Sequence, residues 1–205
     1  MKYSFTTLLF VLLTIAASLA SAQRITGGLK AGMNLANLHG DDIEDSKFKI
    51  GFCGGGFVAF GLGKVVVIQP ELLYSQKGAK REGEFMGETW KATYKFNYLE
   101  MPVFIKMIVP VEGKVKPNFF LGPYFGIMIT DPRGELKVDG TTTEEDMEGV
   151  KDTDFGVVFG SGLDFVLGKG KIVFDVRYGL GLTTLDEEGG DAKNNAFSFL
   201  LGYSF

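Results

Sequence analysis

The side chains that could take part in catalysis are few and lie at the start of the first long polar stretch. His39 is the only histidine of the chain, and Asp41 and Ser46 follow it within seven residues. A hydrolase or acyl-transferase site needs a general base within hydrogen-bond reach of its nucleophile. Sequence spacing does not establish that reach, and a single histidine in a polar loop is more typical of a solvated side chain. We therefore expect no enzyme activity, no catalytic residue and no cofactor.

Carboxylates in the same stretch offer a second kind of chemistry. The segment DDIED carries Asp41, Asp42, Glu44 and Asp45. Hard divalent cations prefer several oxygen ligands, but the segment lacks the spaced acidic pattern of an EF-hand loop. A hydrated acidic surface is the favoured interpretation. A divalent-cation site at these four residues is the weaker alternative.

The totals exclude several classes of protein. A length of 205 residues favours one domain, and a net charge of −4 argues against nucleic-acid binding. A single cysteine leaves no internal disulfide, so the fold must hold without one. Within GFCGGGF, Cys53 is expected to be a small buried residue and not a nucleophile.

The first 22 residues have the features of a secretory signal peptide. Lys2 supplies the positive charge, FTTLLFVLLTIAASLA supplies the apolar region, and ASA supplies the small-residue cleavage site. We expect residues 1–22 to be removed and residues 23–205 to form one exported domain. After the signal, no apolar run is long enough for a membrane-spanning helix.

Beyond residue 23, large apolar residues recur at every second position, which predicts strands with one apolar face. The final stretch, AFSFLLGYSF, illustrates the pattern. Most of these segments are longer than the typical strand of about five or six residues, and they suit the roughly nine to eleven residues of a tilted membrane-crossing strand. The eight segments are 26–37, 49–60, 65–77, 92–106, 116–129, 153–166, 171–183 and 195–205.

The connections between these segments alternate in length. Residues 61–64 and 167–170 are tight turns, and 107–115 is of intermediate length. The other four connections, 38–48, 78–91, 130–152 and 184–194, are long and polar. Three of these, 38–48, 130–152 and 184–194, are rich in acidic residues. Short turns at one end and long loops at the other are typical of outer-membrane barrels. The pattern predicts an all-β, eight-stranded, antiparallel up-and-down transmembrane β-barrel.

The two faces of the expected strands differ sharply. One face is apolar and is predicted to contact lipid, as in Ile68, Leu72, Phe155, Phe159, Phe174, Val176, Phe197 and Phe199. The other face is small or charged, and it suits the side-chain-filled lumen of a narrow barrel. Since an unpaired buried charge is costly, we expect a polar network among Lys30, Gln69, Glu71, Glu100, Lys106, Asp164, Asp175 and Arg177. Tyr203 and Phe205 are expected in an aromatic girdle at the barrel end.

Three prolines, Pro70, Pro102 and Pro123, fall inside the expected strands. Proline cannot donate to a strand ladder, so we expect bulges or strand ends at these positions.

Four stretches resemble the PorT-like outer-membrane β-barrel family of Gram-negative bacteria. They are GLKAGMNLANL (28–38), IQPELLYSQKG (68–78), FNYLEMPVFIK (96–106) and FFLGPYFGIMI (119–129), and the second is the most specific. The resemblance covers about residues 24–205. It implies an eight-stranded membrane barrel with prolines tolerated in its strands, and it supplies no catalytic residues. The founding member's association with protein secretion is not carried over.

The partners expected from this interpretation belong to the cell envelope. They are outer-membrane lipid and lipopolysaccharide, the barrel-assembly machinery through the C-terminal strand, and a surface protein or ligand at loops 38–48, 130–152 and 184–194. We expect a monomer in the outer membrane with a structural or surface-interaction role. A narrow-pore or secretion-associated component is one alternative, and a soluble lipocalin-like lipid carrier is another.

Overall fold

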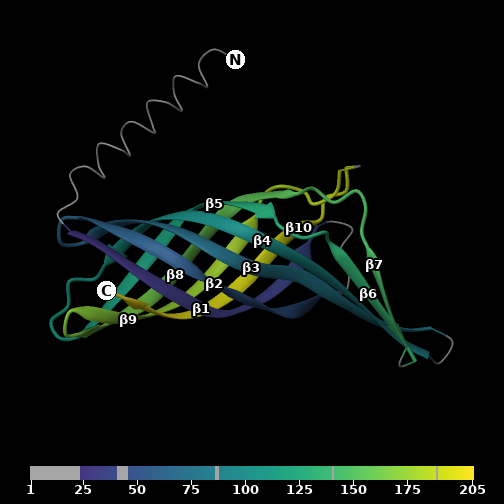
Figure 1. The fold of residues 1–205 in the computed structure, drawn as a ribbon, viewed down its shortest axis with the longest axis horizontal. Helices are drawn as coiled ribbons and strands as arrows, with labels where there is room; N and C mark the ends of the chain where they lie inside the picture. Colours follow the sequence, from purple (N-terminus) through teal and green to yellow (C-terminus); the bar gives the residue numbers. More distant parts are fainter. Residues whose placement is uncertain (1–23, 41–45, 86–87, 140, 188) are drawn as a thin grey trace, which may run out of the picture.

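Eight antiparallel strands close into a ring in the order β3-β2-β1-β10-β9-β8-β5-β4, and the β3–β4 pairing completes it (Figure 1). This confirms the predicted all-β up-and-down barrel. The computed structural model describes residues 24–40, 46–85, 88–139, 141–187 and 189–205. The strands are β1 Arg24–His39, β2 Lys47–Leu62, β3 Val66–Phe85, β4 Glu88–Ile108, β5 Val115–Met128, β6 Arg133–Val138, β7 Thr141–Asp146, β8 Thr153–Leu167, β9 Gly170–Gly181 and β10 Lys193–Ser204.

The two ends of the ring differ, and we call them the short-turn end and the long-loop end. The connections β2–β3, β4–β5 and β8–β9 lie at the short-turn end, together with Arg24 and the C-terminus (Figure 1). There the backbone N–H of Phe205 donates to the carbonyl of Gly27 over 2.9 Å. The expected signal peptide, residues 1–22, lies outside the described residues. Among the residues that are described, no helix has the length and apolar character needed to cross a membrane.

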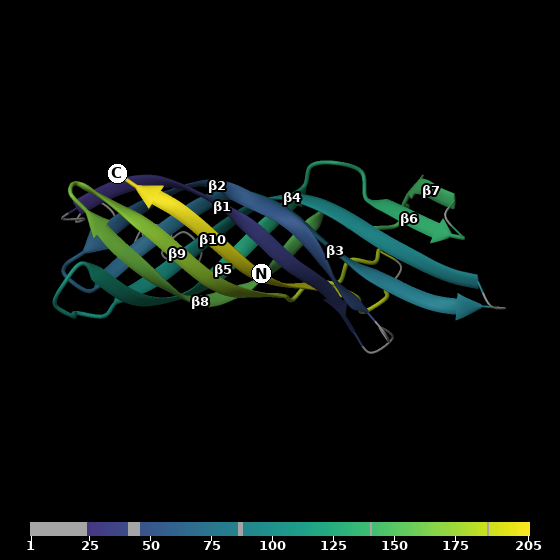
Figure 2. The same ribbon diagram turned by 90° about the horizontal axis from the view of Figure 1, so that it is seen from below.

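Strands β3 and β4 continue well past the ring at the long-loop end. Their pairing runs to Phe85↔Glu88, whereas β4 pairs with β5 only as far as Tyr98↔Met128. The strand β6 then takes the place of β5 beside β4, and β7 pairs with β6. The resulting four-stranded protruding sheet consists of residues 79–85, 88–97, β6 and β7, and Figure 2 shows it extending from the ring. At about 3.3 Å per residue, the stretch 88–97 spans roughly 30 Å.

The protruding sheet corrects two predictions. Residues 78–91 were expected to be a loop but lie mostly in β3 and β4, and residues 130–152 contain the β6–β7 hairpin. In both segments apolar residues do not recur clearly at every second position, so the sequence lacks the signal of a strand. Their polar composition therefore favoured a loop. Pairing with one another gives these segments backbone partners that a sequence pattern does not reveal.

The expectation of bulges or strand ends at the three prolines is also wrong. Pairing between β3 and β4 lapses after Pro70↔Val103 and resumes at Leu73↔Glu100 in the same register. Pairing between β4 and β5 lapses and resumes in the same way after Pro102↔Tyr124. Because each residue of an antiparallel strand bonds toward one neighbour at a time, a proline removes hydrogen bonding on one side only. The register shift that does occur lies between Phe48 and Cys53 on β2.

Gly78 marks the point where β3 leaves the ring. Its φ of +127° lies where L-residues are strained, and an added Cβ would lie 1.9 Å from the carbonyl oxygen of Tyr94. We expect Gly78→Ala to destabilise the barrel by several kcal/mol, since the partner strand's backbone would have to move. Gly113→Ala is the matched control, because Gly113 has φ +97° but no heavy atom within 4 Å of an added Cβ. In urea unfolding, the free energy of unfolding should fall more for Gly78→Ala than for Gly113→Ala. Equal decreases in the two variants would contradict this interpretation.

Candidate functional site

The bore of the ring is filled by buried ion pairs, of which the central cluster is the most densely connected. Lys30 Nζ lies 2.8 Å from Glu71 Oε1 and 2.7 Å from Asp175 Oδ2. The Arg177 guanidinium donates to both oxygens of Glu71, over 2.7 and 3.0 Å, and to Asp175 over 2.7 Å. Gln69 donates to Glu71 over 2.7 Å. Two cations and two carboxylates therefore balance one another away from water, as a buried charge requires.

Two further clusters flank the central one along the bore. Toward the short-turn end, Lys106 and Asn118 each donate to Asp164 over 3.0 Å. Toward the long-loop end, Lys77 lies 2.5 Å from Glu100 and 3.2 Å from Asp154. Tyr124 and Asn194 also donate to Asp154, over 3.0 and 3.1 Å. The charged bore side chains are thus tied to one another at three levels.

All eight residues expected in the lumen network are buried, and the structure brings them into these three clusters. Sequence reasoning missed Lys77 and Asp154 as members, together with their polar partners Tyr98, Tyr124, Asn118 and Asn194. Strand alternation was the available signal, because Lys77 lies on the same face of β3 as Gln69 and Glu71. Cys53 is buried and packs with Leu73 and Leu200.

The residues expected to contact lipid lie on the outer surface of the ring. Leu72, Phe155, Phe159, Phe174, Phe197 and Phe199 are exposed there, as are Tyr203 and Phe205 at the short-turn end. Ile68 and Val176 are half-buried on the same surface, since they lie opposite Ile105 and Phe199 in the ladder. The contact of these side chains with lipid remains a prediction.

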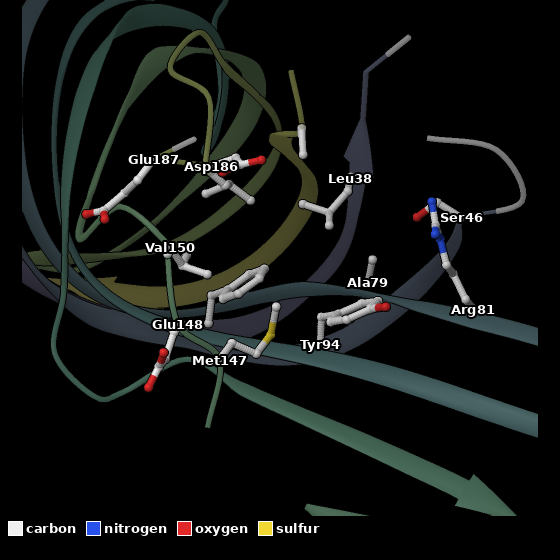
Figure 3. A pocket seen from close by; sticks show the side chains of 14 residues that line it. Leu38, Ser46, Ala79, Arg81, Tyr94, Met147, Glu148, Val150, Asp186 and Glu187 are labelled. Carbon is white, nitrogen blue, oxygen red and sulfur yellow. The ribbon is translucent and has the colours of Figure 1, made fainter. Parts of the chain in front are cut away.

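Above the bore, the long-loop end holds an apolar layer and then a cavity. Phe96, Tyr98 and Leu185 are almost fully buried and form the layer that separates the cavity from the bore. The cavity measures about 710 Å³ and is lined by residues of β1, β3 and β4 and of the connections β1–β2, β7–β8 and β9–β10. We call it the mouth cavity. Figure 3 shows Leu38, Tyr94, Met147 and Val150 around it, with Arg81 and Ser46 on one side and Glu148 and Glu187 on the other.

The candidate catalytic and metal residues do not assemble within the described part of the chain. His39 ends β1 opposite Lys193, and the Ser46 hydroxyl donates to the side-chain oxygen of Asn37. No group of three or more potential metal ligands occurs among the residues that the structure describes. The acidic candidates Asp41, Asp42, Glu44 and Asp45 lie outside those residues.

The protruding sheet has two unlike faces. One face is charged, with Lys95 Nζ 2.5 Å from Glu135 and 3.3 Å from Glu144. The opposite face carries Trp90, Tyr94 and Leu136, and it continues into the wall of the mouth cavity through Tyr94. The alternation of strand side chains separates these two sets.

Glu82 on the charged face should report directly on its ion pairs. Hydrogen bonds from Lys47 (2.8 Å) and Lys91 (2.9 Å) lower the pKa of the Glu82 carboxyl from 4.5 to about 2. A depressed pKa means that these pairs stabilise the sheet fully above pH 4.5 and lose their effect as the pH falls through about 2. In an NMR titration of the carboxyl carbon we expect a midpoint near 2. The Lys47→Gln/Lys91→Gln variant should return it toward 4.5, and a wild-type midpoint near 4.5 would contradict the pairing.

Several solved structures are similar to this chain. Neisserial surface protein A is 12% identical, with a TM-score of 0.50, and the match covers 89% of this chain and 100% of that one. Ail, the attachment invasion locus protein of Yersinia pestis, is 16% identical, with a TM-score of 0.44 and coverage of 88% and 98%. The N-terminal barrel domain of Pseudomonas aeruginosa OprF is 11% identical, with a TM-score of 0.40 and coverage of 88% and 97%.

At these identities the likeness concerns the fold alone. No curated protein matches the chain. The sequence model of the outer membrane protein beta-barrel domain family, however, matches residues 18–187, which include most of the ring and the whole of the protruding sheet. The closed ring, the apolar outer surface and this match agree, and the chain belongs to the outer membrane protein beta-barrel domain family.

Proposed function

We propose that this protein is a recognition anchor of the outer membrane. The barrel holds the chain in the lipid, and the mouth cavity and protruding sheet face outward and bind a ligand or surface partner. The observation that carries the proposal is the contrast between the bore of the barrel and its long-loop end. Paired charges fill the bore, while the long-loop end holds a cavity of about 710 Å³. Recognition residues commonly lie on long connections held by a rigid scaffold.

The filled bore counts against a conducting pore or a secretion channel. The hollow lined by Cys53, Ser75 and Lys77 measures only about 20 Å³, which is room for about one water molecule. A solute would have to displace charged groups that lie 2.5–3.2 Å from their partners. The same interior counts against a lipocalin-like carrier, because a lipid needs an apolar cavity where this barrel has ion pairs.

Further features of the proposal follow from the sequence. Residues 1–22 act as a cleaved signal, the C-terminal strand engages the barrel-assembly machinery, and the protein is a monomer that contacts lipopolysaccharide. Within its family we assign the chain to the PorT-like group, on the strength of IQPELLYSQKG. The protein performs no catalysis.

The proposal is tested with the protein reconstituted in nanodiscs and applied to arrays of peptides and soluble glycans. A trimmed variant, in which residues 131–149 are replaced by a short Gly-Ser turn, serves as the comparison. We expect array signals from the wild type that the trimmed variant loses, while both retain the heat-modifiable gel mobility of a closed barrel. Liposomes containing the wild type should not swell in glycine or arabinose. Retained array binding by the assembled trimmed variant, or rapid swelling, would refute the proposal.

A further inference from the structure

We propose that the mouth cavity binds short apolar peptides with two free ends, taking the carboxylate at Arg81 and the ammonium group at the opposite, acidic wall. The inference rests on the proposed recognition function and names the chemical class of its ligand.

The size and floor of the mouth cavity suit a small amphipathic ligand. Its volume of about 710 Å³ falls within the roughly 300–1,000 Å³ that is usual for small-molecule sites. Phe96 and Leu185, 2% and 4% exposed, form the floor, and Leu38, Met147 and Val150 are partly buried against it. Apolar side chains of a peptide would gain the most by covering this floor.

Arg81 provides the anion-binding wall. It is half-buried and lines the cavity, and within the described part of the chain no carboxylate lies within ion-pair distance of its guanidinium. Arg81 lies opposite Ala92 of β4. The β4 lysines Lys91 and Lys95 are instead paired with Glu82 and Glu135 on the other face of the sheet. An arginine whose donors have no carboxylate partner among the described residues matches a ligand carboxylate through two parallel hydrogen bonds.

The opposite wall is acidic. Glu148 follows β7 and Glu187 follows β9, and both line the cavity with exposed side chains. In the ring order, β9 lies directly across from β3, which carries Arg81. Figure 3 accordingly shows the two glutamates on the far side of the cavity from Arg81.

This distribution of charge selects among ligands. A simple anion would meet one guanidinium but also the three carboxylates of Glu148, Asp186 and Glu187, so the electrostatic balance disfavours it. A simple cation would leave Arg81 facing the cavity with no counter-charge from the part of the chain that the structure describes. A zwitterion with an apolar body satisfies both walls and the floor, and a short peptide is the molecule of that chemistry.

The test uses isothermal titration calorimetry on the full chain in nanodiscs, with empty nanodiscs subtracted. The probes are trileucine, its C-terminal amide and its N-acetyl form. We expect trileucine to bind at least about tenfold more tightly than either capped form, since each loses one charge-assisted contact. Arg81→Gln should abolish the preference for the free carboxylate and keep the preference for the free amine. Glu148→Gln/Glu187→Gln should do the reverse.

Lys80→Gln is the matched control, because Lys80 neighbours Arg81 on β3 but points to the other face of the sheet. It should leave all three affinities unchanged. Equal binding of the three probes by the wild type, no binding at millimolar concentration, or a carboxylate preference that survives Arg81→Gln would each overturn the inference. If the peptide-binding inference fails but array signals still depend on residues 131–149, the proposed recognition function is retained. If the array signals do not depend on residues 131–149, the recognition function itself is refuted, whatever the calorimetry shows.

Discussion

Replacing Arg177 by methionine is expected to lower the free energy of unfolding of the barrel by about 3–5 kcal/mol. The guanidinium makes three hydrogen bonds to Glu71 and Asp175 and lies over the rings of Phe104 and Phe120, 4.9 and 5.3 Å from their centroids. Without it, Lys30 remains as the counter-charge for two fully buried carboxylates. Urea unfolding in detergent micelles, followed by circular dichroism, measures the loss.

Two further variants show whether charge balance is the cause. The double variant Glu71→Gln/Arg177→Met leaves Lys30 paired with Asp175, and it should be more stable than Arg177→Met alone. Lys47→Gln breaks an exposed pair of similar length, 2.8 Å, and should cost about 0–1 kcal/mol. If Arg177→Met were no more harmful than Lys47→Gln, the central cluster would not hold the barrel together.

Phe159→Arg is expected to destabilise the barrel in lipid vesicles by about 2–4 kcal/mol. The Phe159 side chain is 54% exposed and lies near the middle of β8, opposite Leu121 and Tyr178. A charged group there would meet hydrocarbon if the outer surface of the ring faces lipid. Reversible unfolding of the protein from vesicles by guanidinium chloride gives the measurement.

Leu136→Arg is the matched control for this substitution. Leu136 is 46% exposed, and it lies on the protruding sheet instead of the ring. Because an arginine at that position meets water, its effect should stay within about 0.5 kcal/mol. If the two substitutions lowered the stability equally, the side chains of Phe159 and Leu136 would have the same surroundings, and the outer surface of the ring would not face lipid.

The ring strands could be predicted from the sequence because their two faces meet different surroundings. Apolar side chains such as Phe159 and Phe199 point outward, while Asp175 and Arg177 point into the bore, so a period of two survives along each strand. The protruding sheet has no such contrast. Arg81 on its cavity side and Glu82 on its charged side are both ionic, which removes the period from the sequence.

The partners inside the bore could not be predicted for a different reason. Strand alternation places Lys30, Glu71 and Asp175 on the inner face, but it does not fix their heights along the axis. Those heights depend on the register between strands, and Lys30 and Asp175 lie 145 positions apart. The mouth cavity was missed for the same reason, because its walls come from three strands and three connections.

The most direct test of the inside-out arrangement is quenching of tryptophan fluorescence by lipids with brominated acyl chains. Trp90 is the only tryptophan and lies on the protruding sheet, so the wild type reports on the region outside the bilayer. In the variant Trp90→Phe/Phe159→Trp, the reporter lies on the outer surface of the ring. We expect strong quenching in that variant and little in the wild type. Equal quenching in the two proteins, or none at position 159, would contradict a lipid-facing apolar surface.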